Sequence, residues 1–105
     1  MAVSSLTEQD PMAVAAEEAA DVLKSLSNPA RLRLLCALVP QDRSVGELEG
    51  LLDARQSAVS GHLMRLRQEG LVEAVRDGRQ VIYKLSDPRV RPILERLYEV
   101  FCPEL

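Results

Sequence analysis

Hydrophobic residues in the middle of the chain, from Ser44 to Leu85, follow two different periods in succession. They first recur every three or four residues, the spacing that places side chains on one face of an α-helix. Two stretches show this spacing: Val45, Leu48, Leu51 and Leu52, and then Val59, Leu63 and Leu66. The pattern then alternates through Val81, Tyr83 and Leu85, as in a β-strand with one buried face. This order predicts a helix, a second helix and a two-stranded ribbon.

Start and stop signals divide the same region in the same way. Ser44-Val45-Gly46-Glu47 has the form of a capping box, with a hydroxyl at the start of a helix and a carboxylate three residues on. Asp53-Ala54-Arg55 is long enough only for a turn. A second helix is expected from Gln56 to Glu69, with Gly70 as its C-terminal stop. Asp77-Gly78 predicts the tip of the hairpin.

Helical spacing continues on both sides of this region. Residues 1–11 show no periodicity and are expected to form a flexible tail. A first helix is expected from about Met12, with an apolar stripe made of Ala15, Ala19, Val22, Leu23 and Leu26. Ser27-Asn28-Pro29 ends it and starts a second helix that runs to Val39. A last helix follows Ser86-Asp87-Pro88, and its wide stripe comprises Val90, Ile93, Leu94, Leu97, Tyr98 and Phe101.

The predicted fold class is therefore mainly α with a small β-hairpin wing, a winged helix-turn-helix with five helices in residues 12–105. A chain of 105 residues fits one such domain. The fold needs only the middle of the chain for its core, which leaves the apolar faces of the first and last helices in surplus. These faces could simply cover the domain. We favour a two-fold dimer interface, because large exposed apolar surfaces are rare on monomers.

Charge is distributed unevenly along the chain. The net charge is −3, which by itself argues against DNA binding. Between Ala54 and Lys84, however, six basic residues face three acidic ones, so this segment carries +3 and the remainder carries −6. Aromatic residues make up 3%, too few for the stacking platforms that bind single-stranded nucleic acid. No secretion signal or membrane-length apolar run is visible, so a cytoplasmic protein is expected.

Five segments resemble the ArsR/SmtB family of bacterial repressors and occur in the family's order. They are Leu26–Leu32, Val45–Leu48, Gln56–Leu63, Leu66–Val72 and the Gly78-Arg79 wing with Tyr83–Leu85. The resemblance covers about Ala13 to Cys102. It implies a homodimeric transcriptional repressor that binds a near-palindromic operator in double-stranded DNA. The second helix of the motif would enter the major groove and the wing would reach the flanking backbone.

The residues that we expect at the DNA are Gln56, Ser57, Ser60, Gly61, His62, Arg65, Arg76 and Arg79. The family pattern places groove contacts at Gln56, Ser57 and Ser60, with Gly61 and His62 adjacent. Glutamine can pair with adenine edges, and short hydroxyls can reach base edges or phosphates. The three arginines are assigned to phosphates or to the minor groove. For each of them, a solvated surface charge is the alternative explanation.

Metal-sensing members of this family use cysteine pairs before the turn, or histidine and aspartate clusters on the last helix. Here Ser44–Gly50 contains no cysteine, and Asp87–Val100 contains no histidine. His62 is the only histidine, and a lone histidine cannot assemble a metal site. No metal site and no other cofactor is expected.

Two cysteines remain, Cys36 on the second helix and Cys102 at the end of the last, 66 residues apart (102 minus 36). This arrangement resembles the BigR/SqrR/HlyU branch of the family, whose members carry one cysteine in each of these helices and respond to sulfide-derived persulfides or oxidants. The resemblance implies that Cys36 and Cys102 become bridged, by a disulfide or by several sulfurs, and that repression is then relieved. The structural alternative is that both are small buried hydrophobic residues.

The leading functional hypothesis is a repressor that releases its operator when reactive sulfur bridges the cysteine pair. The alternative within this class is a general redox or peroxide switch with a direct disulfide, acting as repressor or anti-repressor. An enzyme is not expected, because there is no Cys-x-x-Cys motif and His62, on the presumed DNA face, is the only candidate for a partner base. A purely protein-binding winged helix is disfavoured by the clustered arginines. The operator sequence, the target genes and the order of thiol attack cannot be inferred from the sequence.

Overall fold

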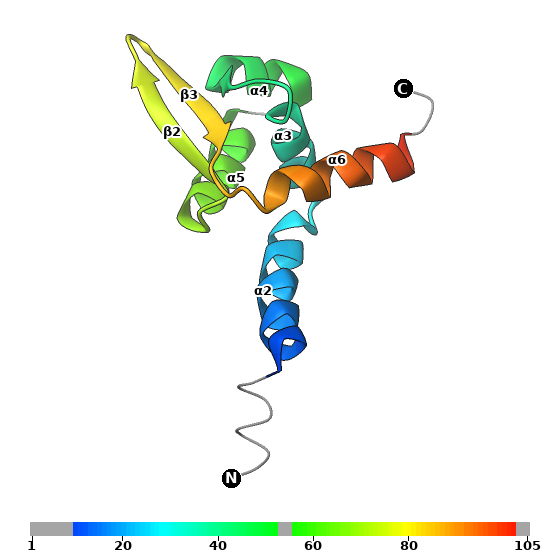
Figure 1. Cartoon of the computed structure of the whole chain (residues 1–105). Helices are drawn as coiled ribbons and strands as arrows, with labels where there is room; N and C mark the ends of the chain where they lie inside the picture. The colour runs from blue at the N-terminus through cyan, green and yellow to red at the C-terminus, as the bar shows by residue number, and fades with distance from the viewer. Residues whose placement is uncertain (1–9, 53–55, 103–105) are drawn as a thin grey trace.

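The computed structural model describes residues 10–52 and 56–102, and it arranges them as five helices and a three-stranded sheet (Figure 1). The helices are α2 (Pro11–Leu26), α3 (Pro29–Ala37), α4 (Val45–Leu52), α5 (Gln56–Gln68) and α6 (Val90–Phe101). The strands are β1 (Arg43–Ser44), β2 (Val72–Asp77) and β3 (Gln80–Leu85). The predicted fold class, a winged helix-turn-helix with five helices, is confirmed. The expected turn at 53–55 and the expected tail, apart from its last two residues, lie outside the described ranges.

Helix boundaries follow the local capping chemistry. The Asp10 carboxylate accepts a hydrogen bond from the Met12 N–H at 2.9 Å, so α2 begins at Pro11, one residue earlier than predicted. The Asn28 side chain caps α3 by accepting from the Arg31 N–H at 3.0 Å. The predicted capping box forms in full: the Glu47 N–H donates to Ser44 Oγ at 3.2 Å, and Glu47 Oε1 accepts from the Ser44 N–H at 2.9 Å.

The sheet has the order β1-β3-β2, with both pairs antiparallel. The sequence predicted a two-stranded ribbon; the short β1 adds a third strand by pairing Arg43 with Tyr83 and Ser44 with Ile82. The hairpin tip is also shifted by one residue. Asp77 pairs with Gln80, so Gly78 and Arg79 form the turn, and Gly78 takes the positive φ of +63° that such a turn requires.

The core lies where α3, α4, α5 and the start of α6 meet the inner face of the hairpin. Ten of its side chains are almost wholly inaccessible to solvent: Leu34, Leu35, Leu38, Leu48, Val59, Leu63, Leu66, Val72, Val90 and Leu94. The predicted inner face of α5 is therefore confirmed. Leu51 is an exception on α4, because its side chain is 44% exposed although its spacing matches the buried stripe. Gly70, at φ +78°, ends α5 as expected.

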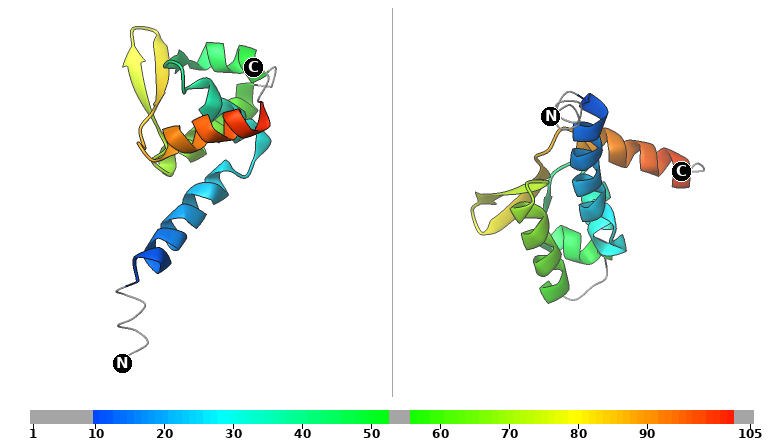
Figure 2. Two further views of the ribbon diagram at one scale, coloured as in Figure 1. Left: turned by 45° about the vertical axis from the view of Figure 1, so that its right-hand side comes forward. Right: turned by 90° about the horizontal axis from the view of Figure 1, so that it is seen from below.

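Helix α2 extends away from this body, and only its C-terminal end is packed against it (Figures 1 and 2). Val22 and Leu26 are buried, whereas Ala15, Ala19 and Leu23 of the same predicted stripe are exposed. Most of the apolar stripe on α2 is therefore not covered by other described residues. None of the helices described is both long enough and apolar enough to cross a membrane.

Candidate DNA-reading face and cysteine pocket

Helix α5 turns one face into the core and leaves the opposite face open. Its inward side chains are fully buried, whereas Ser60, Gly61 and Arg65 are exposed and His62 is half-buried. Gln56 and Ser57 belong to the first turn of α5, but their side chains lie outside the described part of the structure. Met64 is 60% exposed on the same helix. The open face therefore presents small and polar groups beside one large apolar side chain.

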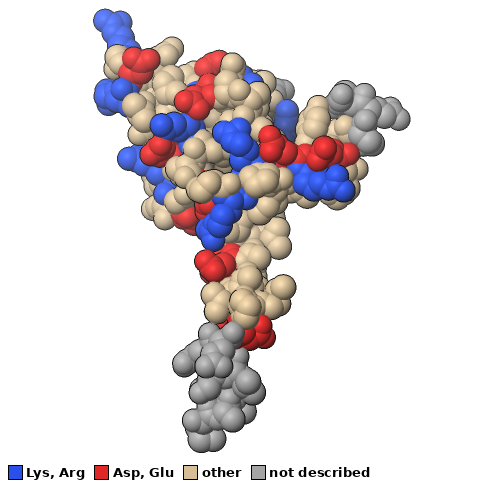
Figure 3. Space-filling model, in the orientation of Figure 1, with Lys and Arg blue, Asp and Glu red and all other residues tan. Residues whose placement is uncertain are grey.

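The hairpin carries its arginines at the tip, where Figure 3 shows basic side chains at the outer edge of the molecule. Arg76 and Arg79 are both exposed, and no carboxylate among the described residues lies within ion-pair distance of either. Arg65 differs, because its Nε lies 3.7 Å from Glu69 Oε2. The two wing arginines are thus open to an external anion, while Arg65 would exchange one anionic partner for another.

The two cysteines occupy equivalent places at the ends of their helices. Cys36 is in the last turn of α3, and Cys102 is the C-cap of α6, where its N–H donates to the Tyr98 carbonyl at 2.8 Å. Both thiols are free and half-buried. Burial, and then the nearby charge of Cys102, raises the pKa of the Cys36 thiol. Burial is therefore the main reason that the Cys36 thiolate is disfavoured, and the charge of Cys102 is a smaller one.

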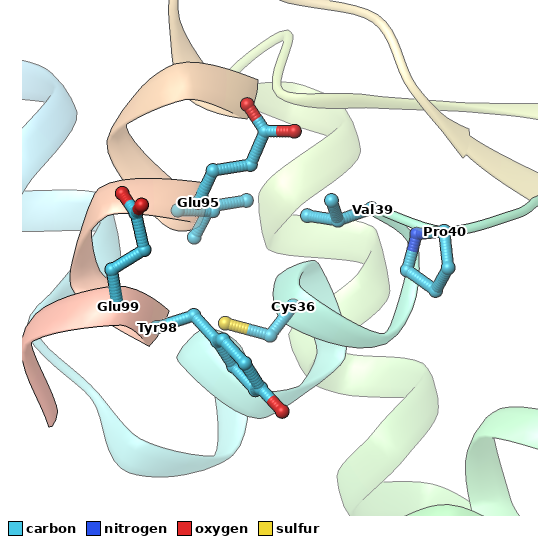
Figure 4. A pocket seen from close by; sticks show the side chains of 7 residues that line it. Cys36, Val39, Pro40, Glu95, Tyr98 and Glu99 are labelled. Atoms are coloured by element: carbon cyan, nitrogen blue, oxygen red, sulfur yellow. The ribbon is translucent and has the colours of Figure 1, made fainter. Parts of the chain in front are cut away.

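A pocket of about 640 Å³ opens between α3 and α6 beside Cys36. It is lined by Cys36, Val39, Pro40, Leu94, Glu95, Tyr98 and Glu99. Figure 4 shows the Cys36 sulfur pointing from α3 toward α6, next to the Tyr98 side chain. A small molecule in this pocket would meet a thiol, an aromatic ring and two carboxylates. The sequence had singled out only the thiol and Tyr98.

Polar links fix the N-terminal half of α6 to the rest of the domain. The Arg91 guanidinium donates to the Val39 carbonyl, just after α3. Arg89 forms an ion pair with Asp87 at 2.7 Å and reaches Glu18 of α2 at 3.5 Å. These three helices therefore meet through side chains that sequence reasoning had not selected. Periodicity marks apolar faces, and it gives no signal for contacts between distant charges.

The C-terminal half of α6 has an apolar face that the other described residues leave largely exposed. Phe101 is 76% exposed and Val100 is 53% exposed, and both line a shallow crevice with Pro92, Ile93, Arg96 and Leu97. On α2, Met12 is 70% exposed. Within the described ranges, no group of three or more histidine, cysteine, aspartate or glutamate side chains is placed to hold a metal ion.

Comparison with known proteins gives one family match, to "Bacterial regulatory protein, arsR family", over residues 28–74. The chain is 44% identical over 87 residues to a biofilm growth-associated repressor from Agrobacterium fabrum, covering 83% of this chain and 74% of that protein. It is 41% identical over 81 residues to the transcriptional activator HlyU of Vibrio cholerae, covering 77% of this chain and 75% of that protein.

Solved structures give the same result. Reduced HlyU from Vibrio cholerae superposes with a TM-score of 0.82 at 38% identity, covering 87% of this chain and 96% of that one. The transcriptional repressor BigR from Xylella fastidiosa superposes with a TM-score of 0.82 at 41% identity, covering 87% of this chain and 93% of that one. Two relatives with opposite regulatory descriptions thus share the fold of this chain.

Proposed function

Because the chain belongs to the ArsR family of bacterial regulatory proteins, and is a DNA-binding transcriptional regulator rather than an enzyme, we propose that it is a homodimeric repressor controlled by its two cysteines. In the reduced state it holds its operator. When reactive sulfur joins Cys36 to Cys102, it releases the DNA. The observation that carries this proposal is that two free, half-buried thiols lie at the C-terminal ends of α3 and α6, which pack against each other with a pocket beside Cys36 between them.

The chemistry needs no group other than the two thiols and a sulfane sulfur donor. The Cys102 thiolate attacks the outer sulfur of a persulfide, R–S–SH; a new S–S bond forms, the donor S–S bond breaks, and R–S⁻ leaves with the electron pair. The Cys36 thiolate then attacks the Cys102 sulfur, and HS⁻ leaves, which gives a disulfide. The two thiols are oxidised and the sulfane sulfur is reduced. If both thiols carry an added sulfur first, the same step gives a bridge of three sulfurs.

Cys102 is assigned the first attack because the thiolate is the nucleophile, and Cys36 is held protonated to a higher pH by its raised pKa. Cys36 is then the resolving thiol. This order also suits the geometry, since Cys102 caps the end of α6, whereas Cys36 lies within the last turn of α3 and packs against the core.

A bridge between Cys36 and Cys102 would affect both the DNA-reading helix and the dimer surface. Helix α3 packs against α5, which carries the DNA-reading face, and also against α6. The apolar side of α6, with that of α2, supplies the surface for a two-fold dimer. Tying the end of α6 to α3 would therefore change how two α5 helices are spaced. A coupling of about 2–3 kcal/mol would lower operator affinity on the order of 30- to 150-fold.

On DNA, the dimer would place its two α5 helices in successive major-groove segments about one helical turn apart. Gln56, Ser57 and Ser60 would meet base edges, with Gly61 and His62 adjacent to them. Arg65 and the two wing arginines would contact phosphates or the minor groove. Ser60, Gly61, Arg65 and the wing arginines are all exposed on the described surface, which supports this assignment.

A second candidate is a general redox switch in which peroxide forms a direct disulfide, in a protein that acts as repressor or anti-repressor. Two comparisons favour keeping it. One structural relative is reduced HlyU, and HlyU is described as a transcriptional activator. The two candidates share the thiol pair and differ in the oxidant and in whether extra sulfur can be added to the cysteines.

Peptide mass mapping of the purified protein separates these candidates. The reduced protein is treated with a persulfide donor and, separately, with hydrogen peroxide. The persulfide proposal predicts that the donor alone gives a Cys102 persulfide, about 32 Da heavier, and a Cys36–Cys102 crosslink with either no extra sulfur or one extra sulfur. Equal crosslinking by both oxidants would favour the general switch. Absence of any crosslink, with Cys102→Ser as the control, would contradict both.

A further inference from the structure

The pocket beside Cys36 carries charge of one sign. Among the described residues that line it, the ionisable ones besides Cys36 and Tyr98 are Glu95 and Glu99, and both are exposed carboxylates. Figure 4 shows both rising from α6, across the pocket from the Cys36 sulfur. Glu99 precedes Cys102 by three residues and Glu95 precedes it by seven, so all three lie on one side of the helix. The two carboxylates therefore flank the pocket into which the Cys36 sulfur opens, and they lie on the helix that ends at Cys102.

The helices that carry the thiols add negative potential of their own. Cys36 lies in the last turn of α3 and Cys102 is the C-cap of α6, so each thiol is at the negative end of a helix dipole. Neither of these two helices has a basic residue in its last turn. Reactive cysteines elsewhere gain from the opposite arrangement, a helix N-terminus or an adjacent cation. The potential here works against any anion that approaches either sulfur.

Described arginines offset only part of this potential. Arg43 Nε donates to the Ala37 carbonyl, directly after Cys36, at 2.6 Å. Arg91 donates its guanidinium to the Val39 carbonyl at one end of the pocket. Arg96 reaches Glu99 at 3.6 Å, but its side chain is 74% exposed, so water and salt screen the pair strongly. Glu95 forms no ion pair with another described residue.

We propose that Glu95 and Glu99 make the cysteine pocket selective by charge, so that uncharged or cationic sulfur donors and oxidants react with the thiols in preference to anionic ones. This inference rests on the proposed function of the thiols as the sensor. The natural inducer would then be a small neutral persulfide or polysulfide, or one carried by an uncharged or cationic thiol. Persulfides carried by dianionic thiols would react slowly with the protein. Each carboxylate is expected to change the rate with a singly charged reagent about 3- to 10-fold, by Coulomb repulsion at an intermediate dielectric.

The test uses three symmetrical disulfides that react by the same step and differ in charge. They are neutral 4,4′-dithiodipyridine, anionic 5,5′-dithiobis(2-nitrobenzoate) and cationic cystamine. In each case a protein thiolate attacks one sulfur, forms a mixed disulfide and releases the other half of the probe as a thiolate. Rates with the reduced full-length protein are divided by the rate of each probe with a small uncharged thiol, which removes differences in intrinsic reactivity. Peptide mapping assigns the thiol that reacts.

The informative variant is Glu95→Gln/Glu99→Gln, and the matched control is Glu73→Gln/Asp77→Asn on the hairpin, which removes two charges far from the pocket. We expect the pocket variant to react at least tenfold faster with the anionic probe, more slowly with cystamine, and within twofold of the parent with the neutral probe. The control variant should behave like the parent. Added salt should raise the anionic rate in the parent more than in the pocket variant.

An unchanged ratio of anionic to neutral rates in the pocket variant would overturn the inference. So would an equal change with all three probes, because that result would mean that the carboxylates act on thiol ionisation rather than on selection. Operator release plays no part in this readout, so charge selection can fail while the sensing role stands. If neither thiol reacts even with the neutral probe, the proposed sensing function fails, and the selectivity fails with it.

Discussion

Cys36 lies within the electrostatic reach of Cys102, although the two residues come from helices at opposite ends of the fold-forming sequence. Burial first, and then a negative charge on Cys102, raises the pKa of the Cys36 thiol. Removing the Cys102 thiol should therefore lower the pKa of Cys36. Burial, the larger cause, disfavours the thiolate form of Cys36 in either case.

The raised pKa of Cys36 predicts how its alkylation depends on pH. Because only the thiolate reacts, Cys36 should react with iodoacetamide at a rate that rises with pH and has its midpoint above the ordinary cysteine pKa. Cys102→Ser should move this midpoint downward, since it removes the smaller of the two causes, while burial keeps it raised. Mass spectrometry of the Cys36 peptide across a pH series measures both values. A midpoint that does not move in Cys102→Ser would mean that the thiols are not coupled.

The exposed apolar face of α6 predicts a dimer that a single introduced charge would dissociate. Phe101 is 76% exposed in the single chain, so Phe101→Glu should leave the fold of a protomer intact and convert the dimer to a monomer. Operator affinity should fall about 100-fold or more, because the second reading helix is no longer linked to the first. Sedimentation equilibrium and fluorescence anisotropy measure the two effects.

Val75→Glu is the matched control for this substitution, since Val75 is a 48% exposed apolar residue on β2, away from α2 and α6. It should remain a dimer. A Phe101→Glu protein that also sediments as a dimer would contradict the assignment of this face.

The wing arginines predict a change in salt dependence. Arg79→Ala removes an exposed cation at the hairpin turn, so binding should weaken for operator and random DNA alike. The slope of log K against log salt should become shallower by about 1. Lys24→Ala, on α2, also removes an exposed charge and should leave the slope unchanged. A slope that Arg79→Ala does not alter would remove this residue from the DNA interface.

The capping box predicts a stability change without a change in sensing. Ser44→Ala removes the hydroxyl that accepts from the Glu47 N–H at 3.2 Å, and should lower the free energy of unfolding by about 1 kcal/mol. Ser60→Ala, at an exposed position inside α5, should cost less than half as much. Urea denaturation monitored by circular dichroism compares the two. Equal losses would show that the box adds no specific stability.

Glu47 adds a pH dependence to the same element. The bond from the Ser44 N–H lowers the pKa of the Glu47 carboxyl. Since the pKa is lower in the folded state, this contribution to stability is complete above the ordinary glutamate range and is lost as pH falls through the lowered pKa. Glu47→Gln should therefore reduce the acid dependence of unfolding.

Features that depend on neighbouring residues could be predicted from the sequence. The Ser44 and Glu47 box, the Asn28 cap and the Gly70 stop are each decided within three or four positions, because the donor and the acceptor belong to the same turn. The inner face of α5 could be predicted equally well, since Val59, Leu63 and Leu66 form a single apolar stripe on that helix. These elements were enough to identify the winged helix-turn-helix.

Features that depend on distant segments could not be predicted. Leu51 and Leu23 have the spacing of core residues, but in the described structure their side chains are 44% and 53% exposed. Strand β1 is two residues long and exists only because β3 lies beside it. The tie from Arg91 to the Val39 carbonyl joins positions 52 residues apart and leaves no trace in either local pattern.

The candidate site shows the same division. Cys36 and Cys102 could be selected because cysteine is scarce and chemically distinctive. The sequence pattern did not select Glu95 and Glu99, because their role depends on the pocket that forms where α3 packs against α6. Their spacing from Cys102, seven and three residues along one helix, was the available signal.

The most direct test of the central claim is operator affinity measured by fluorescence anisotropy before and after treatment with a persulfide donor, for the parent protein, Cys36→Ser and Cys102→Ser. The account predicts that treatment weakens binding by the parent on the order of 30- to 150-fold. Both serine variants should bind with the affinity of the reduced parent and keep it after treatment. Release of the operator by either serine variant to the same extent as by the parent would contradict the account.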